Sequence, residues 1–232
     1  MSKLWIVGDS YSIGSSYKQN LWQYDENWID IVSKQLNVQD NDVENFSQFG
    51  VSNDYIFKKL IESFYQFQEN DYVIIQTTSP SRKWFFVDDP GLSNLTNMRP
   101  GAMSKAHDEA VKGYITHLHN VQLDNIQYTA YVYALQYLII SRPDVKFVVV
   151  PGFGNFPGVQ GNLTDNVCEN EFENAKVLDK FYAKTGYDPR LNHMTHVNHK
   201  VLANKILSNI ENNIPIDLTT GFTSNIYNLN NI

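Results

Sequence analysis

Short apolar runs alternate with stretches of helical periodicity along most of this chain. Three of these runs predict strands of a buried sheet, at 4–7, 72–76 and 146–150, and the more polar segment 42–46 predicts a short second strand. The last run is almost entirely apolar, as a strand covered on both faces of a parallel sheet should be. Strands that alternate with helices favour a parallel α/β sheet.

Apolar residues at intervals of three and four predict helices between these strands. The predicted helices lie at about 24–36, after a cap at Asn53, at about 104–141 with a break near 121–124, at about 171–185 and at about 198–210. We expect a three-layer α/β/α sandwich with a central parallel sheet of about five strands, the fifth in the tail. The length of 232 residues fits one domain over 1–232, with a helical insertion at about 84–141 and a polar tail at about 211–232.

Polar loops follow three of the four predicted strands. The first strand stops at Gly8-Asp9-Ser10, the second precedes Gly50, and the third runs into the hydroxyl-rich segment 77–81. The carboxyl ends of parallel strands meet at one edge of the sheet, where open α/β folds bind their ligands. Ser10 is therefore a candidate nucleophile. The alternative is an ordinary strand-to-helix turn with an N-cap.

A serine hydroxyl is a weak nucleophile until a base takes its proton. The chain has six histidines. Three fall on the predicted mid-chain helix and are interpreted as part of a solvated face: His107, His117 and His119. The other three stand in a loop that leads into the last helix: His193, His196 and His199. A loop beside a scaffold helix is a common place for a catalytic base.

Composition excludes several classes of function. The net charge of −7 argues against nucleic acid as the main partner, because phosphate binding needs clustered Lys and Arg. The single cysteine, Cys168, rules out an internal disulfide. No apolar run reaches the roughly 20 residues of a membrane span. No signal peptide is recognised, so we expect synthesis in the cytoplasm, with release or assembly into a particle left open.

The order of these residues resembles the SGNH hydrolases, the GDSL esterase and lipase superfamily. Gly8-Asp9-Ser10 matches the first family block, and 45–50 (Asn-Phe-Ser-Gln-Phe-Gly) matches the second. Residues 193–196 (His-Met-Thr-His) stand where the family has Asp-x-x-His before its last helix. The resemblance implies a flavodoxin-like fold without a cofactor or metal. It also implies Ser10 as nucleophile, His196 as general base, and an oxyanion hole containing the backbone N–H groups of Ser10 and Gly50.

One departure from the family concerns the oxyanion hole. The family block Gly-x-Asn-Asp reads Thr-Thr-Ser-Pro here, at 77–80, so the asparagine donor is missing. Ser79 takes its position, and its hydroxyl could donate one hydrogen bond. Thr78, Arg82 and Asn53 are the alternatives. Loss of such a donor costs about 10²–10³ in rate where nothing replaces it, so a substitute or a weak enzyme is expected.

The other departure concerns the triad acid, whose place is taken by His193. A second histidine can orient His196 through a hydrogen bond, but it brings no fixed negative charge to stabilise the imidazolium. Asp188 is an alternative partner from the same loop. The remaining alternative is a serine–histidine dyad without a third member.

The sequence thus predicts a serine esterase that acts on a small-molecule or carbohydrate ester, such as an O-acetyl group or a short acyl ester. The insertion would shape its substrate pocket, because loops on the site face set specificity. A rival interpretation is a zinc site formed by His193, His196 and His199 with a carboxylate such as Asp188. Another is a binding or structural module, for example of a phage or surface assembly, that keeps the fold with a decayed site.

Overall fold

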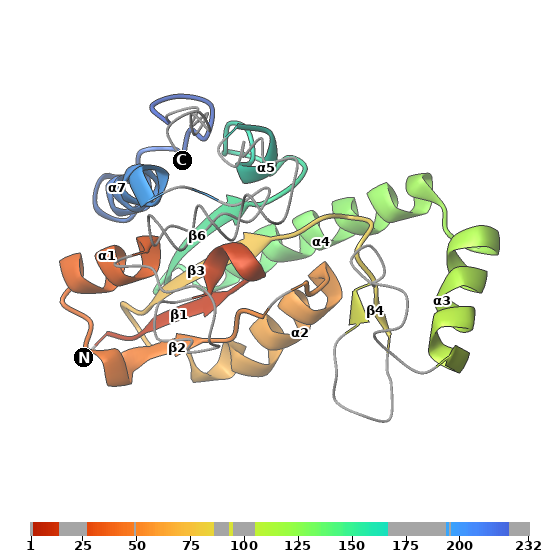
Figure 1. Ribbon diagram of the computed structural model, residues 1–232. Coiled ribbons are helices and arrows are strands. Elements are labelled where there is room, and N and C mark those ends of the chain that lie inside the picture. Colours follow the sequence, from red (N-terminus) through yellow and green to blue (C-terminus); the bar gives the residue numbers. More distant parts are fainter. Residues whose placement is uncertain are drawn as a thin grey trace.

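The computed structural model describes residues 2–13, 27–48, 50–85, 93–94, 105–166, 194 and 196–222. Four strands in these ranges form one parallel sheet in the order β2-β1-β3-β6 (Figure 1). They are β1 (Leu4–Val7), β2 (Val43–Asn45), β3 (Tyr72–Thr77) and β6 (Lys146–Pro151). The predicted α/β class, the parallel sheet and all four predicted strands are confirmed. The described part of the chain adds no fifth strand to this sheet.

Both faces of the sheet are buried, which explains the apolar strand sequences. On β1, Leu4 and Ile6 enter one hydrophobic cluster, whereas Trp5 and Val7 enter the cluster on the opposite face. All four are at most 3% exposed. Successive side chains of a strand point to opposite faces, so a short run without polar residues is what a doubly covered strand requires.

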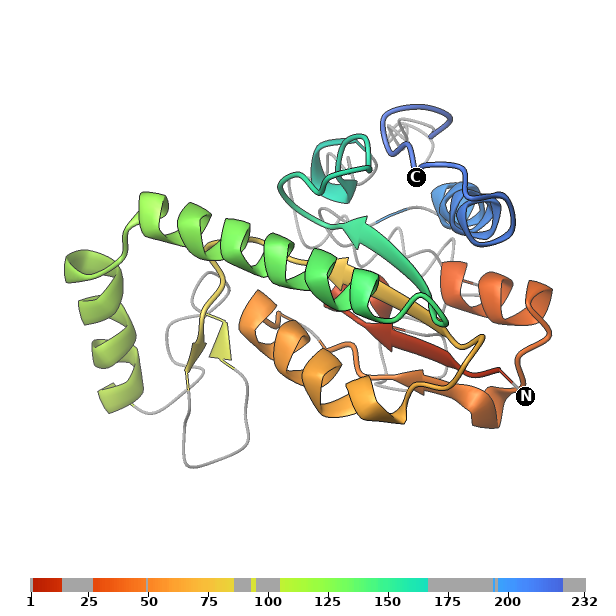
Figure 2. The ribbon, with the colours of Figure 1, turned by 180° about the vertical axis from the view of Figure 1, so that it is seen from behind.

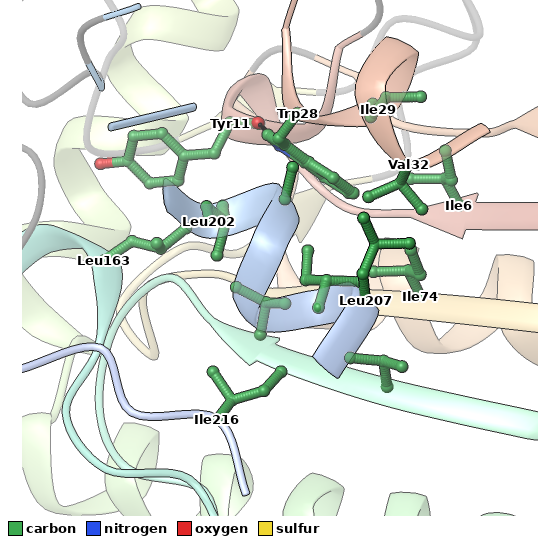
Figure 3. Close-up of a cluster of buried hydrophobic side chains, with 14 of the residues drawn as sticks. Ile6, Tyr11, Trp28, Ile29, Val32, Ile74, Leu163, Leu202, Leu207 and Ile216 are labelled. Atoms are coloured by element: carbon green, nitrogen blue, oxygen red, sulfur yellow. Dashed lines mark hydrogen bonds between the residues drawn. The ribbon is translucent and has the colours of Figure 1, made fainter. Parts of the chain in front are cut away.

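One face of the sheet is covered by α1 (Trp28–Gln35) and α7 (His196–Asn212), which pack against each other. Figure 3 shows Leu202 and Leu207 of α7 facing Trp28 of α1 and the sheet residues beneath them. The other face is covered by α2 (Asn53–Ser63) and α4 (Val121–Ser141), as the opposite view shows (Figure 2). The helices therefore lie in two layers around the sheet.

Helix caps fix two of these boundaries. Asn27 forms a capping box with Asp30: the Asn27 side chain accepts the N–H of Asp30, and Asp30 accepts the N–H of Asn27 at 2.9 Å. Ser52 caps α2 by accepting the N–H of Tyr55, so the cap lies one residue before the predicted one at Asn53. This leaves the Asn53 side chain available for a tertiary contact.

The insertion contains a two-stranded antiparallel sheet and two helices. Its strands are β4 (Trp84–Phe85) and β5 (Ser93–Asn94), and its first helix is α3 (Lys105–His117). The helical region breaks at 118–120, before the predicted break, because Asn120 caps α4 by accepting the N–H of Gln122 at 2.9 Å. The chain thus turns once before α4 returns along the sheet.

The remaining short elements lie between the main ones. They are the 3-10 helices η1 (Ser10–Ser12), η2 (Asp40–Asp42) and η3 (Phe64–Gln66), and the helix α5 (Leu163–Asn166). In the tail, Ile216 and Leu218 are buried in the α1–α7 core, beside a parallel bridge between Gln160 and Asp217. The predicted helix at 171–185 and the rest of the tail from 223 lie outside the described residues.

Candidate active site

The candidate site lies where the strand order of the sheet reverses. From β1 the chain continues to β2 on one side, whereas β3 pairs with β1 on the other side. Open α/β sheets bind ligands at the carboxyl ends of the strands next to such a reversal. Strand β1 ends at Val7, and Ser10 begins η1 three residues later at this end of the strand.

The turn that carries Ser10, residues 8–10, is held by a buried glutamine of β3. Gln76 accepts the Asp9 N–H at 2.9 Å and the Ser12 hydroxyl at 3.2 Å. A Cβ on Gly8 would come within 2.8 Å of both Gln76 Oε1 and Ser12 Oγ, so a larger residue would displace the side chains that hold this turn. Asp9 Oδ1 accepts the Tyr11 N–H at 3.0 Å and so caps η1. These bonds fix the backbone on both sides of Ser10.

A buried ion pair joins this turn to the loop that follows β3. Asp9 is fully buried, and its Oδ2 accepts the Thr78 hydroxyl at 2.6 Å and Arg82 Nη1 at 2.5 Å. The Arg82 side chain is 10% exposed and its guanidinium lies 5.4 Å from the centre of the Phe153 ring. The carboxylate next to Ser10 is therefore neutralised by a cation from the adjacent strand end.

Two of the four candidate oxyanion donors are committed to the protein itself. Asn53 Nδ2 donates to the carbonyls of Thr78 and Ser79, and Asn53 Oδ1 accepts the Thr78 N–H at 2.9 Å. The Thr78 hydroxyl donates to Asp9. Ser79 differs, because its Oγ accepts the Ser81 N–H at 3.4 Å and an accepting bond leaves the hydroxyl proton for another partner. Arg82 Nη1 donates to Asp9 and to Thr78, but a guanidinium has five N–H groups, so Ser79 and Arg82 remain as candidate donors.

The loop after β2 brings Gly50 to the same edge. The Phe46 N–H donates to the Ile6 carbonyl at 2.8 Å, and the Gln48 N–H donates to the Gly8 carbonyl at 3.3 Å. Gly50 itself has a φ of 67°, in the left-handed region that favours glycine. The structure thus brings the Ser10 turn, the Gly50 loop and the Ser79 loop together at one edge of the sheet.

The predicted histidine roles fall mostly on residues whose side chains lie outside the described part of the structure. His196 is the first residue of α7, and its side chain is among these. His193 and Asp188 also lie outside the described part, so the predicted base, its partner and the zinc alternative stay predictions. His199 is 5% exposed and its Nδ1 accepts the Trp28 N–H at 3.4 Å, so it packs between α7 and α1. Within the described residues, no group of three or more His, Cys, Asp or Glu could hold a metal.

One polar cluster near the site was missed by sequence reasoning. His119 does not lie on the predicted solvated helical face: it follows α3, and its Nε2 lies 2.9 Å from Asp124 Oδ2. Asp124 is 1% exposed, and its Oδ1 lies 2.8 Å from Lys83 Nζ. A signal was present in the sequence, because Asp124 shares a helix face with the buried Tyr128 and Leu135. A carboxylate on a buried stripe requires a cationic partner.

A tyrosine of α4 joins the end of β3 to the loop that follows β6. The Tyr128 hydroxyl donates to the Phe153 carbonyl at 3.0 Å and lies 3.3 Å from the Thr77 hydroxyl. Burial raises the pKa of Tyr128, so its hydroxyl stays protonated at neutral pH and acts as a structural donor. This contact ties the insertion to the loop after β6, where Phe153 meets Arg82.

The ion pair generates a test of how the site is held together. Replacing Arg82 with Met keeps the length of the side chain but leaves the Asp9 carboxylate buried without its cation. We expect this to lower the free energy of unfolding by about 3–5 kcal/mol. Adding Asp9→Asn to Arg82→Met should recover part of that loss, because the uncompensated charge is then removed. Urea unfolding of the four proteins in this double-mutant cycle measures both effects; additive losses would contradict the pairing.

The comparisons with known proteins do not assign the chain to a family. Neither a scan against protein-family models nor a search of curated proteins finds a match. Within the described ranges, no helix is both long and apolar enough to cross a lipid bilayer. The features of the chain that bear on its function are the sequence blocks and the convergence of the Ser10, Gly50 and Ser79 loops at the edge of the sheet.

Proposed function

We propose that this protein is a serine ester hydrolase whose nucleophile is Ser10. The observation that carries the proposal is the position of Ser10 at the carboxyl end of β1, beside the reversal in strand order. The Gly50 and Ser79 loops flank it on the neighbouring strands, as an acyl-transfer site requires. A small ester, such as an O-acetyl group or a short acyl ester, is the proposed substrate class.

In the proposed reaction, His196 takes the proton of Ser10 as its Oγ attacks the ester carbonyl. The alcohol then leaves with that proton, and an acyl group remains on Ser10. His196 then takes a proton from water, whose oxygen attacks the acyl carbon. The bond from that carbon to Ser10 Oγ breaks, the carboxylic acid leaves, and His196 returns its proton to Ser10 Oγ. His196 begins α7, which packs against α1 on the face of the sheet whose core includes Tyr11, the residue after Ser10. This position supports the role of His196.

The Asp9–Arg82 pair supports the proposal electrostatically. A tetrahedral intermediate carries a negative oxygen, and an unpaired carboxylate on the residue before the nucleophile would repel it. Arg82 neutralises Asp9 at 2.5 Å in a buried setting, where such repulsion would be strongest. The backbone N–H groups of Ser10 and Gly50, with the Ser79 hydroxyl, are the proposed donors to the oxyanion.

One observation favours a second candidate, a binding or structural module with a decayed site. The Asn53 amide and the Thr78 hydroxyl already donate within the protein, so neither replaces the asparagine donor that the resembled family has. Fold alone does not imply activity. The two candidates differ in whether Ser10 and His196 support turnover of an ester.

The serine and histidine roles are tested with short p-nitrophenyl esters and acetylated sugars. Ser10→Ala and His196→Ala should each lower kcat by at least about 10³-fold, because a missing nucleophile or base leaves only residual catalysis. Ser33→Ala on α1 and His117→Ala at the end of α3 are matched controls away from the site, and both should keep the wild-type rate. Equal rates in all five proteins would refute the esterase proposal.

The oxyanion role of Ser79 is tested by a comparison of two conservative variants. Ser79→Ala should lower kcat by about 10²-fold with little change in KM, because the donor acts on charge that develops in the transition state. Thr78→Val removes the neighbouring hydroxyl, which donates to Asp9, and should instead lower stability in urea. A Ser79→Ala enzyme with unchanged kcat would refute the oxyanion role of Ser79.

A further inference from the structure

Helix α4 carries two apolar stripes, of which the sheet uses only one. Tyr128, Val132 and Leu135 are buried against α2 and the sheet. The second stripe faces outward and consists of Leu123, Ile126, Ala130, Tyr133, Tyr137 and Ile140, called the α4 seam below. Ile126, Tyr133, Tyr137 and Ile140 are 65%, 68%, 74% and 77% exposed.

The spacing of the α4 seam is that of a helix-pairing surface. Its successive members are separated by three, four, three, four and three residues. This is the heptad pattern in which apolar side chains fit between those of a second helix that has the same repeat. A helix that only covers a sheet needs one apolar stripe, and the buried stripe of α4 already fills that role.

The exposed apolar area of the α4 seam reaches the size that often marks an interaction site on a soluble protein. An aromatic side chain can bury about 150–250 Å², so Tyr133 and Tyr137 together contribute roughly 200–350 Å² at their exposed fractions. The aliphatic members of the seam add to this. Isolated soluble proteins rarely expose contiguous apolar patches above a few hundred Å². In Figure 2, α4 lies at the front of the molecule and no other ribbon crosses its length.

The residues that flank the α4 seam indicate what covers it. In the heptad frame these positions hold only uncharged residues: Gln122, Gln127, Thr129, Ala134, Gln136 and Ser141. Such positions normally select a partner through opposite charges and reject like ones. Lys83 donates to Gln127 beside the seam, but this cation is paired with the buried Asp124. The flanking residues themselves carry no charge, so two copies of the same face meet without like-charge repulsion, even though the chain carries a net charge of −7.

We propose that the α4 seam is the interface of a homodimer in which two α4 helices pack about a two-fold axis. A two-fold interface brings one patch against its own copy, so the patch must be self-complementary. The α4 seam meets this requirement in spacing, apolar character and neutral flanks. At 21 residues, α4 is about 31 Å long, which is enough for three heptads. This interface does not depend on the proposed esterase activity.

The test is the mass of the protein in solution, measured by sedimentation velocity and light scattering over about 1–100 µM. Wild type should have twice the mass of its 26.7 kDa chain. Ile126→Glu and Tyr137→Glu each place a carboxylate in the seam, and each should raise the dimer Kd by at least about 100-fold, because an unpaired charge in an interface is costly. Tyr137→Phe keeps the apolar ring and should remain a dimer.

Tyr65→Glu is the matched control, because Tyr65 is 89% exposed on η3 and lies off the α4 seam. It should remain a dimer, with the far-UV circular dichroism of all variants unchanged. A wild-type protein that is monomeric at about 100 µM would overturn the proposal. So would a dimer that survives both seam carboxylates, or one that Tyr65→Glu dissociates equally well.

Discussion

The buried pair between Asp9 and Arg82 is the interaction on which the candidate site depends. It crosses from the end of β1 to the loop after β3, the two neighbouring strands at the reversal of the sheet. Gln76 holds the backbone of the same turn, and Asn53 holds the backbone of the opposite loop through Thr78. Each of these polar groups is buried and bonded, so the loss of one leaves the others uncompensated. The site is therefore a connected polar layer above an apolar core.

Strands β1, β3 and β6 were predictable because they are buried on both faces, and a short run of mostly apolar residues is typical of such a strand. Boundaries were less predictable. Helix α2 is capped by Ser52 rather than Asn53, since both residue types cap helices and the tertiary bonds of Asn53 to the Thr78 loop decide between them. The Asp9–Arg82 pair joins residues 73 apart in the sequence, and no local pattern relates them.

The candidate site, like the fold, could be predicted only in part. The order of Ser10, Gly50 and Ser79 along the chain was sufficient to predict that they share one edge, because parallel strands end together. Sequence could not decide among the oxyanion donors, whereas the hydrogen bonds of Asn53 and Thr78 remove two of them. The sequence also carried a signal for the polar cluster around Asp124. An acidic residue on a buried helix stripe implies a nearby cation, and in the structure Asp124 pairs with Lys83 and lies beside His119.

The central claim is that Ser10 forms a covalent intermediate with its substrate. The most direct measurement is the intact mass of the protein after treatment with a fluorophosphonate, followed by peptide mapping of the adduct. The Oγ of an activated serine attacks the phosphorus and displaces fluoride, and the phosphonyl adduct resembles the tetrahedral intermediate, whereas an ordinary turn serine does not react. The account predicts one phosphonyl group per chain, located on Ser10 and absent from Ser10→Ala. An unmodified wild-type protein, or an adduct that persists in Ser10→Ala, would contradict it.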